Sequence, residues 1–95
     1  LAQNIYLVSV GIADYPGTEN DLTLPAKDAE TIQWIYQKNQ KAETILLTDA
    51  QATRSNVLSS MTRIFNKASA KDIIVLFFSG HGYKGGLKDN EAMSN

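Results

Sequence analysis

The chain has no cysteine, one histidine and two prolines among its 95 residues. The absence of cysteine excludes a disulfide framework and a thiolate metal site, although it leaves the redox compartment open. The apolar runs are too short to span a bilayer, and the first residues do not form a signal peptide, which favours the cytoplasm without defining the compartment. Nine basic residues against ten acidic ones, with no basic run, predict neither nucleic acid nor an anionic membrane as a partner.

Three apolar runs separated by two amphipathic stretches organise the rest of the chain. Strands are predicted for Ile5 to Gly11, Glu43 to Thr48 and the run Asp72 to Phe78. The first helix is expected from about Ala26 to Gln40, with Pro25 at its start. A second helix is expected up to about residue 68, capped by the hydroxyl of a threonine at position 53.

Each predicted helix carries an apolar stripe that should face the sheet. The stripe of the first helix consists of Ala29, Ile32, Ile35 and Tyr36. The stripe of the second helix consists of Val57, Leu58, Met61, Ile64, Phe65 and Ala68, which leaves Ser59, Ser60, Arg63 and Lys67 for solvent.

Alternation of apolar strands with helices predicts an α/β fold, a three-layer α/β/α sandwich with a mostly parallel sheet. We expect right-handed crossovers and the strand order 2-1-3. In that order the first and third strands are neighbours, and the crevice outside their carboxyl ends is the point where such sheets bind ligands. The loop after Gly11, with Asp14 and Tyr15 as candidate rim residues, would line this crevice opposite the end of the third strand.

The third strand breaks into Ser79-Gly80-His81-Gly82, which brings the single histidine to the predicted crevice. A histidine titrates near neutral pH and can pass protons in either direction. Glycines beside it allow backbone amides to approach a substrate closely. This segment is therefore the candidate catalytic motif of the chain, although histidine followed by glycine also occurs in purely structural turns.

These residues resemble the first part of a caspase-like or metacaspase-like cysteine peptidase, of the caspase-hemoglobinase fold. An apolar strand ending in Ser79-Gly80-His81-Gly82 is similar to the family's histidine motif. The stretch Leu24 to Ala29 resembles the metacaspase segment that opens the first helix. It departs from that segment at Pro25, where many metacaspases have cysteine, and at Lys27, where asparagine is frequent.

What the resemblance implies is a Cys-His dyad in which His81 activates a cysteine that lies beyond this chain. In the caspase pattern the cysteine follows the histidine by roughly 50 residues, and the chain ends at Asn95. Residues 1–95 are accordingly expected to be the N-terminal, histidine-bearing part of a single caspase-like domain. The expected partner is the C-terminal segment or chain that carries the cysteine. No cofactor or metal is expected, and calcium dependence is left open.

The resemblance also assigns roles to three further residues. The backbone amide of Gly82 would donate to the tetrahedral oxyanion. Asp28 and Ser79 would line the S1 pocket, where a carboxylate favours a peptide substrate with arginine or lysine at P1. Each side chain also has a simpler interpretation: Asp28 as a first-turn acid stabilised by the helix dipole, and Ser79 as a hydroxyl that satisfies a loop amide.

Other functions compete with the peptidase. A non-catalytic caspase-like pseudoprotease or interaction module would keep the fold without the chemistry, and a flavodoxin-like ligand-binding domain would have the same strand order. Ser79 as nucleophile is disfavoured because no elbow or orienting acid is visible. Lys84-Gly85-Gly86 does not match a P-loop. A third strand without a neighbour would expose an apolar edge, so the chain alone is expected to be poorly soluble and inactive.

Overall fold

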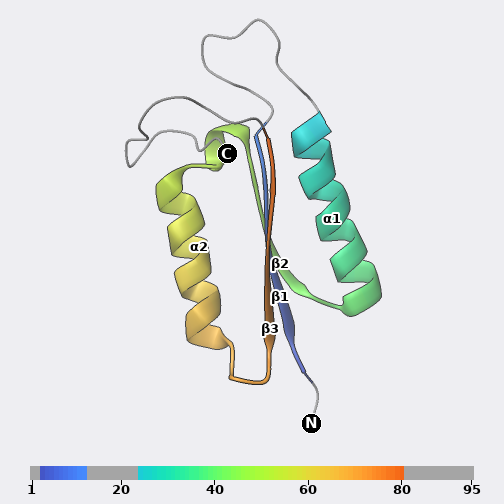
Figure 1. The fold of residues 1–95 in the computed structure, drawn as a ribbon, viewed down its shortest axis with the longest axis vertical. Helices are drawn as coiled ribbons and strands as arrows, with labels where there is room; N and C mark the ends of the chain where they lie inside the picture. The colour runs from blue at the N-terminus through green and yellow to red at the C-terminus, as the bar shows by residue number, and fades with distance from the viewer. Residues whose placement is uncertain (1–2, 13–23, 81–95) are drawn as a thin grey trace, which may run out of the picture.

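The computed structural model describes residues 3–12 and 24–80, which form one small sheet and the helices that cover it (Figure 1). The elements in chain order are β1 (Ile5–Gly11), α1 (Leu24–Gln40), β2 (Glu43–Thr48), a 3-10 turn (Asp49–Gln51), α2 (Arg54–Lys67) and β3 (Ile73–Ser79). Both β2 and β3 pair with β1 in parallel, which gives the order β2-β1-β3. The predicted strand order and parallel sheet are therefore confirmed.

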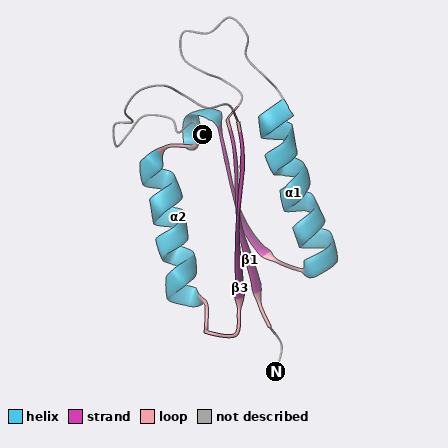
Figure 2. Cartoon of the chain, in the orientation of Figure 1, coloured by secondary structure: helices cyan, strands magenta, loops and turns pink. Residues whose placement is uncertain are grey.

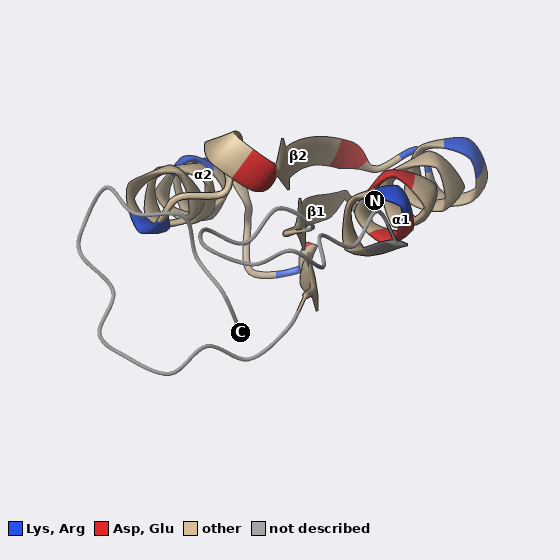
Figure 3. Ribbon diagram, turned by 90° about the horizontal axis from the view of Figure 1, so that it is seen from above, with Lys and Arg blue, Asp and Glu red and all other residues tan. Residues whose placement is uncertain are grey.

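The two helices lie on opposite faces of the sheet, with α1 on one side and α2 on the other (Figures 1 and 2). The view from above shows the same three layers (Figure 3). This arrangement confirms the predicted α/β/α sandwich for the described part of the chain. No helix in residues 24–80 combines the length and apolarity needed to cross a bilayer.

The central strand β1 is buried on both faces because it has a neighbouring strand on each side and a helix above and below. Its even-numbered residues, with Val8 and Val10 at the centre, join Val57 and Ile64 of α2 in one core cluster. Its odd-numbered residues point to the opposite face, towards α1, because side chains alternate along a strand. Ser9 is fully buried on that face.

The helix starts follow the predicted chemistry. Thr53 caps α2, since its hydroxyl oxygen accepts a hydrogen bond from the Asn56 amide at 3.1 Å. Helix α1 begins at Leu24, slightly earlier than predicted, so that Pro25 lies within its first turn. Proline is tolerated there because the first helical amides have no partner within the helix.

The predicted apolar stripes are wrong at three positions. Leu58 and Phe65 of α2 are exposed, Phe65 by 58%, and Ser60 is buried in their place. Ile35 of α1 is also partly exposed at 37%. Helix α2 packs mainly over β1 and β2. This part of the sheet is too narrow to cover the whole apolar stripe of the helix. The sequence alone shows the apolar residues of a helix but not the width of the surface that covers them.

The third strand is less buried than its sequence indicates. All of its residues are at least partly accessible, and Leu76 is 44% exposed. The reason is that β3 is an edge strand of the sheet formed by the described residues. A continuous apolar run is typical of a central strand, but here only one edge of β3 is paired.

A side-chain clamp ties the start of β1 to the start of β3. Both carboxylate oxygens of Asp72 accept hydrogen bonds from backbone amides, one from Asn4 at 2.9 Å and the other from Ser69 at 2.8 Å. The pKa of Asp72 is below its ordinary value of 3.8. The hydrogen bond from the Ser69 amide is the main cause, and the bond from the Asn4 amide adds to it. The Ile73 amide also donates to the Asn4 carbonyl at 3.0 Å, which sets the register where the two strands begin.

Candidate active site

The carboxyl ends of β1 and β3 meet where the sequence predicted the ligand crevice. Gly11 is paired with Ser79 in the strand register. The pairing extends one residue further, because the Ile12 amide donates to the Ser79 carbonyl at 3.0 Å. Ser79, the first residue of the histidine motif, is thus held on the sheet by main-chain hydrogen bonds next to β1.

Asp28 of α1 reaches the same end of the sheet. The Ser79 hydroxyl donates to Asp28 Oδ2 at 3.4 Å, a long contact for an O–H···O hydrogen bond. The Asp28 side chain is exposed, and the Ser79 side chain is half-buried. Because α1 begins at Leu24, Asp28 lies beyond the first turn, which contains no acidic residue. Its interpretation as a first-turn acid is therefore wrong, since the helix dipole acts mainly within the first turn.

One hydrogen bond holds the start of α1 close to β1, and one glycine permits the close approach. The fully buried Ser9 hydroxyl donates to the Ala29 carbonyl of α1 at 2.7 Å. A side chain at Gly11 would collide with α1, since a Cβ atom there would lie 2.2 Å from the Pro25 carbonyl oxygen. The helix therefore approaches the strand more closely at this point than any residue other than glycine allows.

Neither Ser9 nor Gly11 was predicted to act at the site. The available signal for Ser9 was a hydroxyl within an otherwise apolar strand, because a buried polar group needs a partner. For Gly11 the signal was a glycine at the exit of a buried strand, which often marks a close backbone approach. Neither signal identifies the partner, which lies on helix α1 and, for Ser9, is 20 positions further along the chain.

The remaining predicted site residues lie outside the described part of the structure. These are His81 and Gly82 of the histidine motif, together with the rim candidates Asp14 and Tyr15. The last described residue is Gly80, directly before His81. The catalytic and oxyanion roles of His81 and Gly82 therefore stay predictions, as do the roles of the two rim residues.

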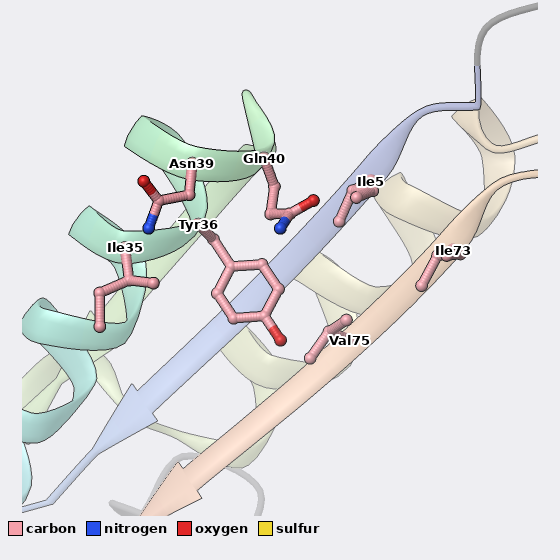
Figure 4. A pocket seen from close by; sticks show the side chains of 7 residues that line it. All are labelled: Ile5, Ile35, Tyr36, Asn39, Gln40, Ile73 and Val75. Atoms are coloured by element: carbon pink, nitrogen blue, oxygen red, sulfur yellow. The ribbon is translucent and has the colours of Figure 1, made fainter.

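A cavity of about 380 Å³ lies at the opposite end of the sheet (Figure 4). It is lined by Ile5, Ile35, Tyr36, Asn39, Gln40, Ile73 and Val75. Figure 4 shows the Tyr36 ring extending from α1 over the sheet towards Val75 of β3. Ile5 and Ile73 begin their strands, so this cavity is at the amino ends and is separate from the Asp28 and Ser79 pair. Ligands of parallel sheets bind at the carboxyl ends.

The chemistry available to the described side chains at the carboxyl end is cation recognition. An ionised carboxylate accepts hydrogen bonds from a guanidinium or ammonium group, and a neighbouring hydroxyl helps to orient it. Within residues 3–12 and 24–80, no three side chains of His, Asp or Glu cluster as metal ligands would. The expectation that the site uses no metal or cofactor stays a prediction.

The fold and the site define a doubly wound α/β domain with a polar pair at the switch point of its sheet. Comparison with protein families identifies the family: the model described as caspase domain matches residues 6–94. The chain therefore belongs to the caspase domain family, and the predicted caspase-like peptidase family is confirmed. A search of curated proteins gave no match.

Proposed function

We propose that the chain is the histidine-bearing part of a cysteine endopeptidase that cleaves peptide bonds after arginine or lysine. The observation that carries the proposal is the contact between Ser79 and Asp28 at the carboxyl end of the sheet. It brings a carboxylate to the strand that leads directly into His81. Membership of the caspase domain family supports peptidase chemistry in general, and the carboxylate supports a basic P1 residue.

In this proposal the substrate's basic side chain lies against Asp28, with the Ser79 hydroxyl as a second polar contact. His81 takes the proton of the cysteine thiol, and the resulting thiolate attacks the scissile carbonyl. The protonated His81 then gives its proton to the leaving amine, and water hydrolyses the acyl group that remains on the cysteine, which regenerates the thiol. The Gly82 amide donates to the oxyanion of the tetrahedral intermediate.

In the proposed mechanism the cysteine is supplied by a partner segment, because residues 1–95 contain none. We propose that this segment completes the domain, whether it is covalently continuous or a separate polypeptide. Intact mass spectrometry of the native protein tests this directly. A second polypeptide containing cysteine, or a longer single chain, is the expected result, and a native protein with the mass of this chain alone would contradict the proposal.

The activity assay compares peptide substrates that differ only at P1. Arginine, lysine and their uncharged analogue citrulline are offered to the complete protein under reducing conditions. Arginine and lysine should be cleaved, and citrulline should be cleaved about 100-fold less efficiently. Asp28 is exposed in the free chain, but a bound substrate would shield the charge pair from water, and loss of one partner of a shielded pair costs about 2–5 kcal/mol. His81→Ala should lower kcat by roughly 10²–10⁴-fold.

The variant Asp28→Asn tests whether the Asp28 carboxylate itself recognises the basic P1 side chain. It should remove most of the preference for arginine over citrulline while citrulline cleavage is nearly unchanged. Glu30→Gln is the matched control, because Glu30 is an exposed carboxylate on the same helix. Cleavage after aspartate, or an unchanged preference in Asp28→Asn, would refute the proposed specificity. A complete protein that cleaves none of the substrates would favour the non-catalytic caspase-like module.

A further inference from the structure

The structure explains how the helix that carries Asp28 is held relative to β3. Asp28 approaches Ser79 from a different layer of the fold, so their separation depends on how α1 sits on the sheet. The two residues are 51 positions apart in sequence and have only one long hydrogen bond between them, 3.4 Å in length. That contact is too weak and too exposed to set the position of the helix by itself.

Close to Asp28, a hydrogen bond from the Ser9 hydroxyl joins helix α1 to β1. This hydroxyl is fully buried, and it donates to the carbonyl of Ala29, the residue after Asp28, at 2.7 Å. Ala29 is itself fully buried against the sheet. A short hydrogen bond in a dry environment constrains both the rotation of the helix and its position along the strand.

The position of Ser9 in the sheet links it to the site. Ser9 is two residues before Gly11, which pairs with Ser79 in the register. Gly11 permits the Pro25 carbonyl to approach the strand, and Ser9 holds the next turn of the helix through Ala29. The same short stretch of β1 therefore supports both partners of the pair, Ser79 through strand pairing and Asp28 through the helix.

We propose that Ser9 is a positioning residue for substrate specificity: through the Ala29 carbonyl it holds Asp28 at the distance from Ser79 at which the carboxylate meets a basic P1 side chain. This inference rests on the proposed function of Asp28. It differs from a purely structural role, because loss of the hydroxyl should change which substrate is preferred and not only how much protein is folded.

The test compares arginine and citrulline at P1 in the complete protein carrying Ser9→Ala. A positioning role predicts a drop of roughly five- to tenfold in the ratio of the two kcat/KM values, mainly through KM for the arginine substrate, because small displacements of a binding group are costly. The ratio does not depend on the concentration of folded enzyme. A structural role alone would lower both kcat/KM values by the same factor and leave the ratio unchanged, which would overturn the inference.

Two further comparisons keep the test decisive. Ser60→Ala removes a buried serine hydroxyl from α2, on the opposite face of the sheet, and should leave the ratio unchanged. If Ser9→Ala does not fold, Ser9→Thr and Ser9→Val are compared instead. Threonine and valine have nearly the same volume as each other, and both are favoured in strands. The threonine variant should keep a higher ratio than the valine variant, and equal ratios would overturn the inference.

The variant Asp28→Asn distinguishes failure of this inference from failure of the proposed function. If it leaves the arginine preference intact, the role of Asp28 in the proposed function is wrong, and the inference about Ser9 falls with it. If it abolishes the preference while Ser9→Ala does not change it, only the inference is wrong. In the double variant, Ser9→Ala should cause no further loss of preference.

Discussion

The hydroxyl of Ser79 donates to Oδ2 of Asp28 at 3.4 Å, across 51 positions of sequence. This contact joins the end of β3 to the second turn of α1, at the end of the sheet where parallel folds bind ligands. Ser79 belongs to the segment that is similar to the family's histidine motif, and Asp28 belongs to the segment that was predicted to open the first helix. The fold therefore explains how two separate motifs come together at one end of the sheet.

The contact predicts that Ser79 matters less than Asp28 for the choice of P1 residue. Ser79→Ala should lower the ratio of arginine to citrulline cleavage by about two- to fivefold, because a long, exposed hydrogen bond contributes about 1 kcal/mol or less. The carboxylate remains in that variant and still meets the basic side chain. Steady-state kinetics on the complete protein measure the ratio, and a loss as large as that of Asp28→Asn would contradict this ranking.

Gly11→Ala should destabilise the domain through a steric clash between β1 and α1. The new Cβ would lie 2.2 Å from the Pro25 carbonyl oxygen, and a backbone atom cannot rotate away as a side chain can. The helix must shift outward, which costs typically 1–3 kcal/mol for overpacking in a buried site. Urea unfolding followed by circular dichroism gives the change. An unfolding midpoint equal to that of the unmodified protein would mean that α1 is not held against the strand.

Truncation of two neighbouring residues of α2 should change the free energy of unfolding by very different amounts. Ile64 is 1% exposed and belongs to the core, whereas Phe65 is 58% exposed. Ile64→Ala should lower the free energy of unfolding by about 2–5 kcal/mol. Phe65→Ala should change it by about 0.5 kcal/mol or less, as exposed substitutions usually do. Equal losses in the same urea titration would show that Phe65 is covered in the folded protein.

The Asp72 clamp should make stability fall in acid. Amide hydrogen bonds from Ser69 and Asn4 lower the pKa of Asp72 in the folded state, so the ionised form stabilises the fold above the ordinary pKa of 3.8. This contribution is lost as the pH falls through the lower pKa of the folded state. Asp72→Asn should therefore be less stable than the unmodified protein at pH 7, and the gap should narrow below pH 3.8.

Thermal melts at a series of pH values measure this difference. Glu30→Gln removes an exposed carboxylate from the outer part of α1, so it controls for the loss of one negative charge. Its melting temperature should stay near that of the unmodified protein across the whole series. A constant gap between Asp72→Asn and the unmodified protein down to strongly acidic pH would contradict the role of the ionised carboxylate.

The partly exposed strand β3 predicts edge-to-edge aggregation of the chain on its own. Leu76 is 44% exposed on this edge strand, and a lysine there blocks pairing with another chain. Leu76→Lys should lower light scattering and raise the yield of monomer in size-exclusion chromatography. Leu58→Lys is the matched control, because Leu58 is similarly exposed but lies on helix α2. Equal improvement by both variants would point to general hydrophobicity and not to strand pairing.

Much of this protein was predictable from the sequence because its local signals agree with its fold. The bounds of β1 and β2 match the predicted ones, since each apolar run ends at turn or polar residues. The cap at Thr53 was also visible, because capping is a local interaction between a hydroxyl and an amide a few residues away. The histidine motif and the helix-opening segment were sufficient to identify the family, which the comparison with the caspase domain then confirmed.

Only the tertiary structure decided what depends on distant parts of the chain. Whether Phe65 is covered depends on the width of the sheet beneath α2, and the burial of β3 depends on its place at the edge of the sheet that the described residues form. The sequence by itself determined the order of the elements and the family, because both follow from local patterns. The bond from Ser9 to Ala29 and the meeting of Asp28 with Ser79 arise from packing between layers, which no local pattern encodes.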